Sequence, residues 1–265
     1  ITISDHPLSP SGVGTQTRYI MEALLRTGKY RILSFAGAIK HQDYRVQSTP
    51  EFGQDWLIKP VDGYGTQEMI RGAVQSEKPD FVWIMTDPRF YGWLWQIEEE
   101  IRTYCPLVYY HVWDNYPYPD YNAVWYRSND FIATISKVTD DIVKTLAPEV
   151  ESKYIPHAVN SEIFKPKRDE ELTKKFRQEM TDGKDKVVFF WNNRNARRKQ
   201  SGTLIFWFNE FLKKVGEDKA TLVMHTDVKD PNGQDLEKII KYLNLDNGQV
   251  RFSTQKVSPS ELASL

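Results

Sequence analysis

Short apolar runs alternate with segments of helical periodicity along almost the whole chain, and this alternation constrains the fold more than any other feature. Six runs are rich in β-branched or aromatic residues and are bounded by polar or turn residues, as buried strands are: Ile32 to Ala36, Phe81 to Met85, Leu107 to His111, Phe131 to Ile135, Val187 to Trp191 and Leu222 to His225. Helix-period segments lie between them, such as Thr15 to Thr27, which closes at Gly28, and Trp93 to Arg102. Buried strands that alternate with helices predict the α/β class, with parallel sheets covered on both faces.

The chain is long enough for two domains, because 265 residues exceed the usual size of one. The best boundary is a polar, proline-bearing stretch from Pro156 through Lys167, which precedes a charged helical segment, Arg168 to Met180. A new strand begins near Lys186. We therefore expect two Rossmann-like domains, residues 1–158 and 159–265.

The second domain holds fewer expected strands than the first. Only three are found after Lys186, the last near Val250 to Ser253, whereas a doubly wound domain has five or six. We therefore expect the C-terminal domain to be incomplete at Leu265.

Composition excludes several classes of protein. The net charge of -1 provides no global positive field, which weighs against a dedicated nucleic-acid binder. A single cysteine, Cys105, excludes an intrachain disulfide and a multi-cysteine metal site, as expected for a cytoplasmic protein. No apolar stretch approaches the roughly 18 residues that a membrane span needs. Aromatic residues make up 13% of the chain, and such residues fill cores or line clefts that stack on sugars or bases.

The first candidate site is the segment Ser11 to Thr15, between an opening strand and the first helix. Gly12 and Gly14 let a ligand approach the backbone, and a helix N-terminus favours an anion. The dinucleotide fingerprint is not met, because its third glycine would fall at Thr17. The segment is equally compatible with an ordinary tight turn.

The second candidate is the segment Tyr110 to Tyr116, at the carboxyl end of an expected strand. Ligand crevices of open α/β sheets lie at such ends, which places His111 and Asp114 where a site is expected. A histidine at a strand end is also often a structural hydrogen-bonding residue. The polar and aromatic residues that follow His111 favour a site, with Asp114 and Tyr116 on the acceptor side.

The third candidate is the segment Asn193 to Lys199, which places four cations in six residues between a buried strand and a helix. Arginine offers a bidentate fork and lysine a point charge, and both suit a diphosphate at a helix entrance. The alternative is a solvated basic loop. Its position favours a site, because it repeats the strand-to-helix geometry of the Gly12 loop.

Several motifs are absent from the sequence. It has no D-x-D carboxylate pair for a metal-bound nucleotide, no phosphate loop of the G-x-x-x-x-G-K-[ST] type and no G-x-S-x-G elbow, so we expect no metal and no cofactor. His225 and Asp227 form another strand-end polar cluster, which either borders the same site or only ends the strand.

Taken together, the motifs resemble those of the retaining GT-B glycosyltransferases often called family 4. Four segments match in order: Ser11 to Gly14, Val108 to His111, Tyr154 to Asn160 with Phe164 and Pro166, and Arg194 to Lys199. The third is similar to the family's I-P-H-G-V-D followed by F-x-P, from which Ala158 and Asn160 depart. The fourth is similar to R-N-x-x-R-K, with Asn193 in place of the usual glycine.

The resemblance implies a GT-B fold, in which two Rossmann-like domains face each other across a cleft. The N-terminal domain would take the acceptor, and the C-terminal domain the nucleotide-sugar donor. Arg194 and Lys199 would grip the donor diphosphate, His111 would contact the transferred sugar, and Gly12, Gly14, Asn193 and His225 would border the donor. The implied activity is metal-independent transfer of a sugar to an acceptor hydroxyl with retention of configuration.

One expected segment of the family, E-x7-E, is not found in the 265 residues, although its glutamates normally contact the ribose and the donor sugar. This motivates an alternative function, a non-catalytic nucleotide-sugar-binding or assembly module that keeps the GT-B fold. A GT-B epimerase or phosphorylase is a third possibility. The sequence leaves open the donor sugar, the nucleotide, the oligomeric state and the acceptor, which could be a lipid, glycan, protein, small molecule or nucleic acid.

Overall fold

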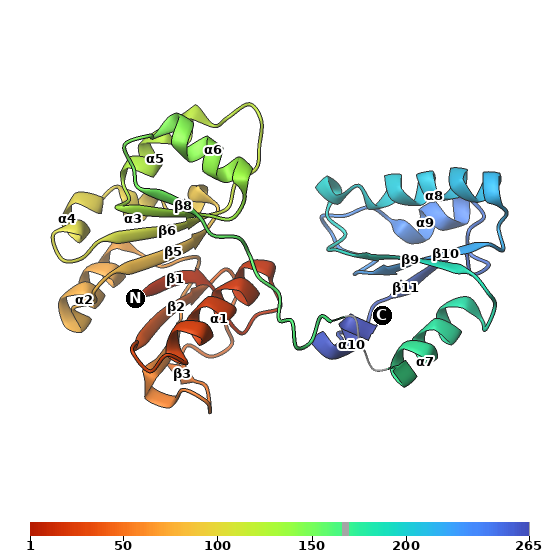
Figure 1. Ribbon diagram of the computed structural model, residues 1–265, viewed down its shortest axis with the longest axis horizontal. Helices are drawn as coiled ribbons and strands as arrows, with labels where there is room; N and C mark the ends of the chain where they lie inside the picture. Colours follow the sequence, from red (N-terminus) through yellow and green to blue (C-terminus); the bar gives the residue numbers. More distant parts are fainter. Residues whose placement is uncertain (166–169, 265) are drawn as a thin grey trace. The chain divides into compact units, whose positions relative to one another are not determined.

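The computed structural model describes residues 1–165 and 170–264, which form two compact units, Ile1–Ala158 and Val159–Leu265 (Figure 1). Pro166, Lys167 and Arg168 of the expected junction, and Leu265, lie outside the described residues. Within those residues, no helix combines the length and the apolar character that crossing a membrane requires.

Unit 1 is built on an eight-stranded sheet with the order β3-β4-β2-β1-β5-β6-β7-β8. All neighbouring strands are parallel except β3, which pairs antiparallel with β4. The strands are β1 (Thr2–Asp5), β2 (Ile32–Gly37), β3 (Gln47–Ser48), β4 (Trp56–Pro60), β5 (Val82–Thr86), β6 (Leu107–His111), β7 (Phe131–Thr134) and β8 (Ser152–Tyr154). β1 lies between β2 and β5. After β1 the chain adds β2 to β4 on one side of it, and then β5 to β8 on the other side.

Helices cover both faces of this sheet, as expected for an α/β domain. They are α1 (Gly12–Leu25), α2 (Gln67–Glu77), α3 (Gly92–Trp95), α4 (Glu98–Arg102), α5 (Ala123–Arg127) and α6 (Lys137–Leu146). Neighbouring residues of one strand enter different cores. Ile84 and Tyr109 belong to the core that includes residues of α2 and α6, whereas Met85 and Tyr110 pack in the core of α1. Continuous apolar runs are therefore required in these strands, and this is the pattern that the sequence displays.

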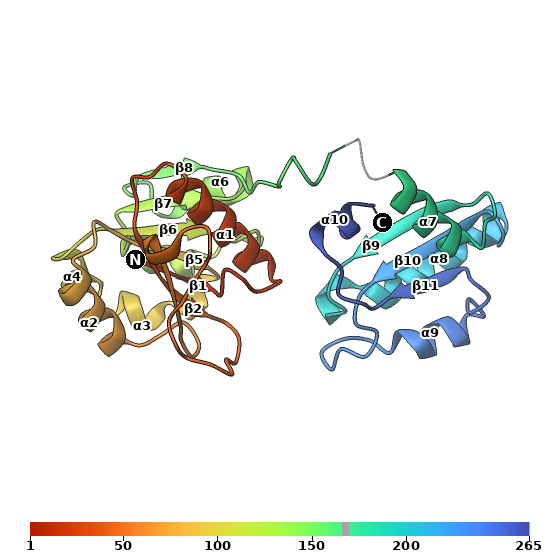
Figure 2. The same ribbon diagram turned by 90° about the horizontal axis from the view of Figure 1, so that it is seen from below.

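Unit 2 has a three-stranded parallel sheet with the order β11-β10-β9. Its elements are β9 (Val187–Asn192), β10 (Ala220–His225), β11 (Val250–Ser253), α7 (Glu170–Thr181), α8 (Ser201–Val215), α9 (Leu236–Tyr242) and α10 (Pro259–Ser264). Helices α8 and α9 lie on one face of the sheet, and α7 and α10 lie on the other (Figures 1 and 2).

The α/β class and the parallel sheets expected from the sequence are confirmed. Some elements differ from expectation: β3, β4 and β8 were not expected, and the single helix expected from Trp93 to Arg102 is two short helices, α3 and α4. The break falls at Ile97, whose backbone is not helical (φ −120°, ψ 20°). The apolar periodicity continues across this break, so it gave no signal of it.

One buried tyrosine joins β1 and β5 where these two strands separate. The two strands pair only at Thr2 with Trp83 and at Ile3 with Ile84. Beyond it, the Tyr91 hydroxyl lies 2.8 Å from the carbonyl oxygen of Ile3 and 2.7 Å from that of Met85. A single hydroxyl therefore bridges the two strands, and its one proton is shared between two buried carbonyl oxygens.

The role of this hydroxyl is testable with Tyr91→Phe, because Tyr91 is 0% exposed. We expect this variant to lower the free energy of unfolding of unit 1 by about 1–3 kcal/mol, since the buried bridge between β1 and β5 loses its only hydroxyl donor. Hydrogen exchange of the β5 amides as a function of urea measures this locally. Tyr116→Phe is the control, because Tyr116 is 89% exposed. Equal stability of the two variants would contradict the bridging role.

Candidate functional site

The carboxyl ends of the three strands of unit 2 place polar side chains on one edge of the sheet. His225 ends β10, and the register sets it beside Asn192 of β9 on one side and Ser253 of β11 on the other. Its Nδ1 lies 2.8 Å from the Ser253 hydroxyl. The predicted loop from Asn193 to Lys199 starts at this same edge, so the structure brings His225, Asn193 and Arg194 to one end of the sheet.

Asn195 fixes the shape of this loop. It is fully buried, its Nδ2 donates to the carbonyl oxygen of Gln234 (2.8 Å), and its Oδ1 accepts from the Ser201 hydroxyl (2.6 Å). A side chain at Gly233 would place its Cβ 2.0 Å from the Asn195 carbonyl oxygen, so only glycine permits this close approach. Asn195 therefore anchors the loop both to the segment after β10 and to the start of α8.

Arg194 is exposed but held in place. Its guanidinium forms an ion pair with Asp230, whose side chain is 7% exposed against 64% for Arg194. Hydrogen bonding to Arg194 holds the pKa of Asp230 below its usual value, and Asp230 in turn raises the pKa of Arg194. Most of the Arg194 side chain is open to solvent, so the guanidinium keeps donors free for a second anion.

The remaining cations of the loop form one turn of 3₁₀ helix, Arg197–Lys199, directly before α8. Among residues 1–165 and 170–264, these three cations form no ion pair, in contrast to Arg194. The amide of Gly202 in the first turn of α8 is capped by the Gln234 side chain (2.8 Å). Unneutralised cations beside the N-terminus of a long helix create a local positive potential that favours a bound anion.

The two glycines of the first candidate site differ in their surroundings. A Cβ at Gly14 would lie 2.6 Å from the His6 carbonyl oxygen and 2.6 Å from the Ser9 hydroxyl, so this glycine is required by the protein's own packing. A Cβ at Gly12 would meet no described atom within 4 Å. Ser11 caps α1 by accepting from the Gly14 amide (2.9 Å) and also donates to Asp5 (2.7 Å). Open space for a ligand therefore lies at Gly12 rather than at Gly14.

His111 lies at the end of β6 as predicted, but its ring is completely buried. Nδ1 is 3.0 Å from the Tyr109 hydroxyl, and Nε2 is 2.9 Å from the Tyr126 hydroxyl. Tyr109 donates its only proton to the Thr86 carbonyl oxygen (2.7 Å), so Nδ1 must donate to Tyr109 and Nε2 must accept from Tyr126. Burial lowers the pKa of His111 to about 3, which keeps the ring neutral.

Contact of His111 with a sugar therefore stays a prediction. It requires the Tyr126 side chain to move away from Nε2 of His111.

The two predicted acceptor-side residues are exposed, in contrast to the buried His111. Asp114 is exposed, and Tyr116 is 89% exposed with its ring against Tyr118. Sequence reasoning missed Asp230, Gln234 and Tyr126, because only the fold brings them to Arg194, Asn195 and His111. In the described part of the chain, no group of three or more His, Cys, Asp or Glu side chains is arranged to hold a metal ion.

No family model matches the chain, and no curated protein matches it. Solved structures do match. A glycosyltransferase from Rickettsia africae has a TM-score of 0.68 at 14% identity, with 96% of this chain and 68% of that chain covered. An E. coli trehalose-6-phosphate protein bound with UDP-2-fluoro glucose has a TM-score of 0.65 at 10% identity, with coverages of 98% and 74%.

A third match is a UDP-forming trehalose-phosphate synthase from Burkholderia xenovorans, solved in complex with glucose-6-phosphate, with a TM-score of 0.58 at 11% identity. The match covers 99% of this chain and 75% of that chain. Identities this low show the fold alone. The chain has the mixed α/β fold of the GT-B glycosyltransferases, with two parallel sheets in two Rossmann-like units.

The buried state of His111 makes the stability of unit 1 depend on pH. An unfolded histidine titrates near pH 6.5, so below that pH the unfolded chain binds a proton that the folded chain excludes. The free energy of unfolding therefore falls as the pH falls from 6.5 toward the folded pKa of about 3. Between pH 7 and pH 5 we expect His111 to account for a loss of about 2 kcal/mol.

Urea unfolding at pH 7 and at pH 5, of the wild type and of His111→Gln, measures this loss. The variant has no imidazole to protonate, so its stability should fall less between the two pH values. Parallel losses in the two proteins would show that His111 is not a buried neutral base.

Proposed function

We propose that the chain is a glycosyltransferase that moves a sugar from a nucleoside-diphosphate-sugar donor to an acceptor hydroxyl, with retention of configuration and without a metal ion. The observation that carries this proposal is the arrangement around Arg194 and Lys199: a cationic loop, fixed by Asn195, between the carboxyl end of β9 and the N-terminus of α8. In open α/β sheets this is where ligands bind.

The chemistry follows from the charge that develops in the reaction. The bond between the anomeric carbon and the terminal phosphate oxygen breaks, and its electron pair moves onto the leaving diphosphate. Cations already held in place stabilise this charge more in the transition state than in the ground state. Each charge-assisted hydrogen bond contributes roughly 1.5–3 kcal/mol. Arg194 is prepared for this role because Asp230 holds its guanidinium.

The acceptor hydroxyl forms the new bond on the face that the diphosphate leaves. Its proton passes to the departing phosphate oxygen, so neither a carboxylate nucleophile nor a metal-bound base is required. Unit 2 is the proposed donor domain, with Asn193 and His225 beside the diphosphate and sugar. Unit 1 is the proposed acceptor domain, with Gly12 open to a ligand and Asp114 and Tyr116 exposed after β6.

The similar solved structures support this donor class. One is bound with UDP-2-fluoro glucose, and another is described as UDP-forming and is in complex with glucose-6-phosphate. A uridine diphosphate sugar is therefore the first donor to test, and a sugar phosphate is the first acceptor. The proposed location is the cytoplasm, as the single cysteine suggests.

The proposal predicts that Arg194→Ala and Lys199→Ala each lower kcat/KM for sugar transfer by about 10²-fold or more, because each removes a preorganised contact to the leaving diphosphate. Arg194→Lys keeps the charge but loses the bidentate fork, so its loss should be intermediate. Release of nucleoside diphosphate from a panel of donors, with and without acceptor, gives the rates.

Lys213→Ala is the matched control. Lys213 lies in the last turn of α8, is exposed, and is paired with Glu210, so its removal changes the net charge equally without touching the loop. Transfer by Arg194→Ala and Lys199→Ala at the rate of this control would refute the assignment. Binding of a donor without any turnover would instead support a non-catalytic module.

A further inference from the structure

The side chain of Gln234 lies against the first turn of α8, beside the cations of the proposed donor site. Its Oε1 accepts from the Gly202 amide (2.8 Å) and, at longer range, from the Ser201 hydroxyl (3.4 Å). A Cβ at Gly202 would lie 2.9 Å from Nε2 and 3.0 Å from Oε1 of Gln234, so the two groups are in close contact. Oε1 therefore takes one of the backbone donors with which a helix N-terminus binds an anion.

This oxygen is neutral, although the entrance of α8 is cationic. The 3₁₀ turn Arg197–Lys199 comes directly before α8, and within residues 1–165 and 170–264 its side chains form no ion pair. The side-chain amide of Gln234 has no net charge and leaves these cations uncompensated. An N–H group binds an ionised phosphate oxygen roughly twice as strongly as a neutral acceptor. A phosphate at this entrance therefore competes successfully with Oε1 for the Gly202 amide.

The backbone of Gln234 is held separately from its side chain. Its carbonyl oxygen accepts from Asn195 Nδ2 (2.8 Å), and its amide donates to Asn195 Oδ1 (3.3 Å). The preceding residue, Gly233, also packs on the backbone of Asn195, because a Cβ there would lie 2.0 Å from the Asn195 carbonyl oxygen. Rotation of the Gln234 side chain therefore frees the Gly202 amide and leaves the anchor of the cationic loop intact.

Such a rotation costs little, because the side chain is weakly held. Gln234 is only partly buried, and in the described part of the chain its Nε2 donates no hydrogen bond to another residue. Asn195 differs in both respects, since it is completely buried and bonded through both atoms of its amide group. A Gln234 side chain that turns into solvent also regains rotamer freedom. Gln234 is therefore the movable amide of this site, and Asn195 is the fixed one.

We infer that the Gln234 side chain is a removable cap of the proposed donor site. Oε1 holds the Gly202 amide until the donor binds, and a diphosphate oxygen then takes this amide while the side chain turns into solvent. This role rests on the proposed function, because it concerns the anion held by Arg194 and Lys199. It adds the Gly202 amide to the contacts of the diphosphate. A side chain that only supports the site would strengthen binding of the diphosphate, whereas a removable cap opposes it.

Calorimetric titration of the wild type, Gln234→Ala and Gln234→Glu with uridine diphosphate tests this role. We expect Gln234→Ala to bind uridine diphosphate about 2- to 10-fold more tightly than the wild type, because binding no longer breaks the hydrogen bond of the cap. Gln234→Glu should bind it at least about 10-fold more weakly, since a carboxylate caps a helix N-terminus better and repels the diphosphate. A Gln234→Ala protein that binds no more tightly than the wild type would overturn the inference.

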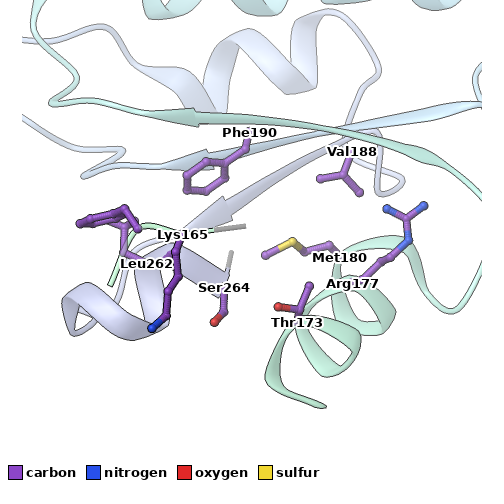
Figure 3. Close-up of a pocket in the computed structure, with 10 residues that line it drawn as sticks. Lys165, Thr173, Arg177, Met180, Val188, Phe190, Leu262 and Ser264 are labelled. Carbon is purple, nitrogen blue, oxygen red and sulfur yellow. The ribbon is translucent and has the colours of Figure 1, made fainter. Parts of the chain in front are cut away.

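Gln178→Glu is the matched control for the added charge. Gln178 is exposed on α7, which lies on the face of the sheet opposite to α8 (Figures 1 and 2). A hollow of about 620 Å³ lies on this opposite face, with Lys165 and Arg177 among its lining residues (Figure 3). A diphosphate bound in that hollow would respond to Gln178→Glu, next to Arg177. Equal weakening of binding by Gln178→Glu and Gln234→Glu would therefore contradict a cap at α8.

Nuclear magnetic resonance of the unsubstituted protein follows the same movement without the risk that a variant misfolds. Saturation with uridine diphosphate should shift the side-chain amide signals of Gln234 to the positions of a solvent-exposed glutamine, and should shift the Gly202 backbone amide as well. Unchanged Gln234 signals in protein that binds uridine diphosphate would overturn the cap and leave the proposed function standing. A wild type that neither binds uridine diphosphate nor transfers a sugar would overturn the proposed function, and the cap with it.

Discussion

The structure of the candidate site depends on the hydrogen bonds of one buried amide, Asn195. This side chain joins the loop after β9 to the start of α8 and to the turn at Gln234. Without these hydrogen bonds, repulsion among the four cations would favour an extended loop in solvent. With them, Arg194 is positioned to pair with Asp230. Residues Arg197–Lys199 then form a 3₁₀ turn just before α8. The electrostatic argument for function depends on this geometry, since a positive charge assists a reaction only if it is fixed beforehand.

The two units use the same parallel-sheet design for different purposes. In unit 1, the carboxyl ends of the strands are tied together by buried hydroxyl groups, with Tyr91 between β1 and β5 and Tyr109 and Tyr126 around His111. In unit 2, the same ends carry exposed cations and a half-buried histidine. The first arrangement rigidifies a scaffold, whereas the second leaves charge available to a ligand. This contrast is why the proposed donor site lies in unit 2.

The fold was largely predictable from the sequence, and the site only in part. Continuous apolar runs mark strands covered on both faces, and so the inner strands of both sheets were found, except β4. β4 was missed because Trp56 to Pro60 mixes buried residues with an exposed lysine and ends in proline. The cationic loop was identified from residue types alone. The pairing of Arg194 with Asp230 and the contact of His111 with Tyr126 depend on residues 36 and 15 positions away, and no local pattern reveals them.

A structure of the protein with a bound nucleoside diphosphate would test the central claim most directly. The account expects the diphosphate at the carboxyl end of β9, with its oxygens within hydrogen-bond distance of Arg194 and of Lys199, and with Arg194 still in contact with Asp230. A diphosphate bound elsewhere, with these two cations left in solvent, would contradict it.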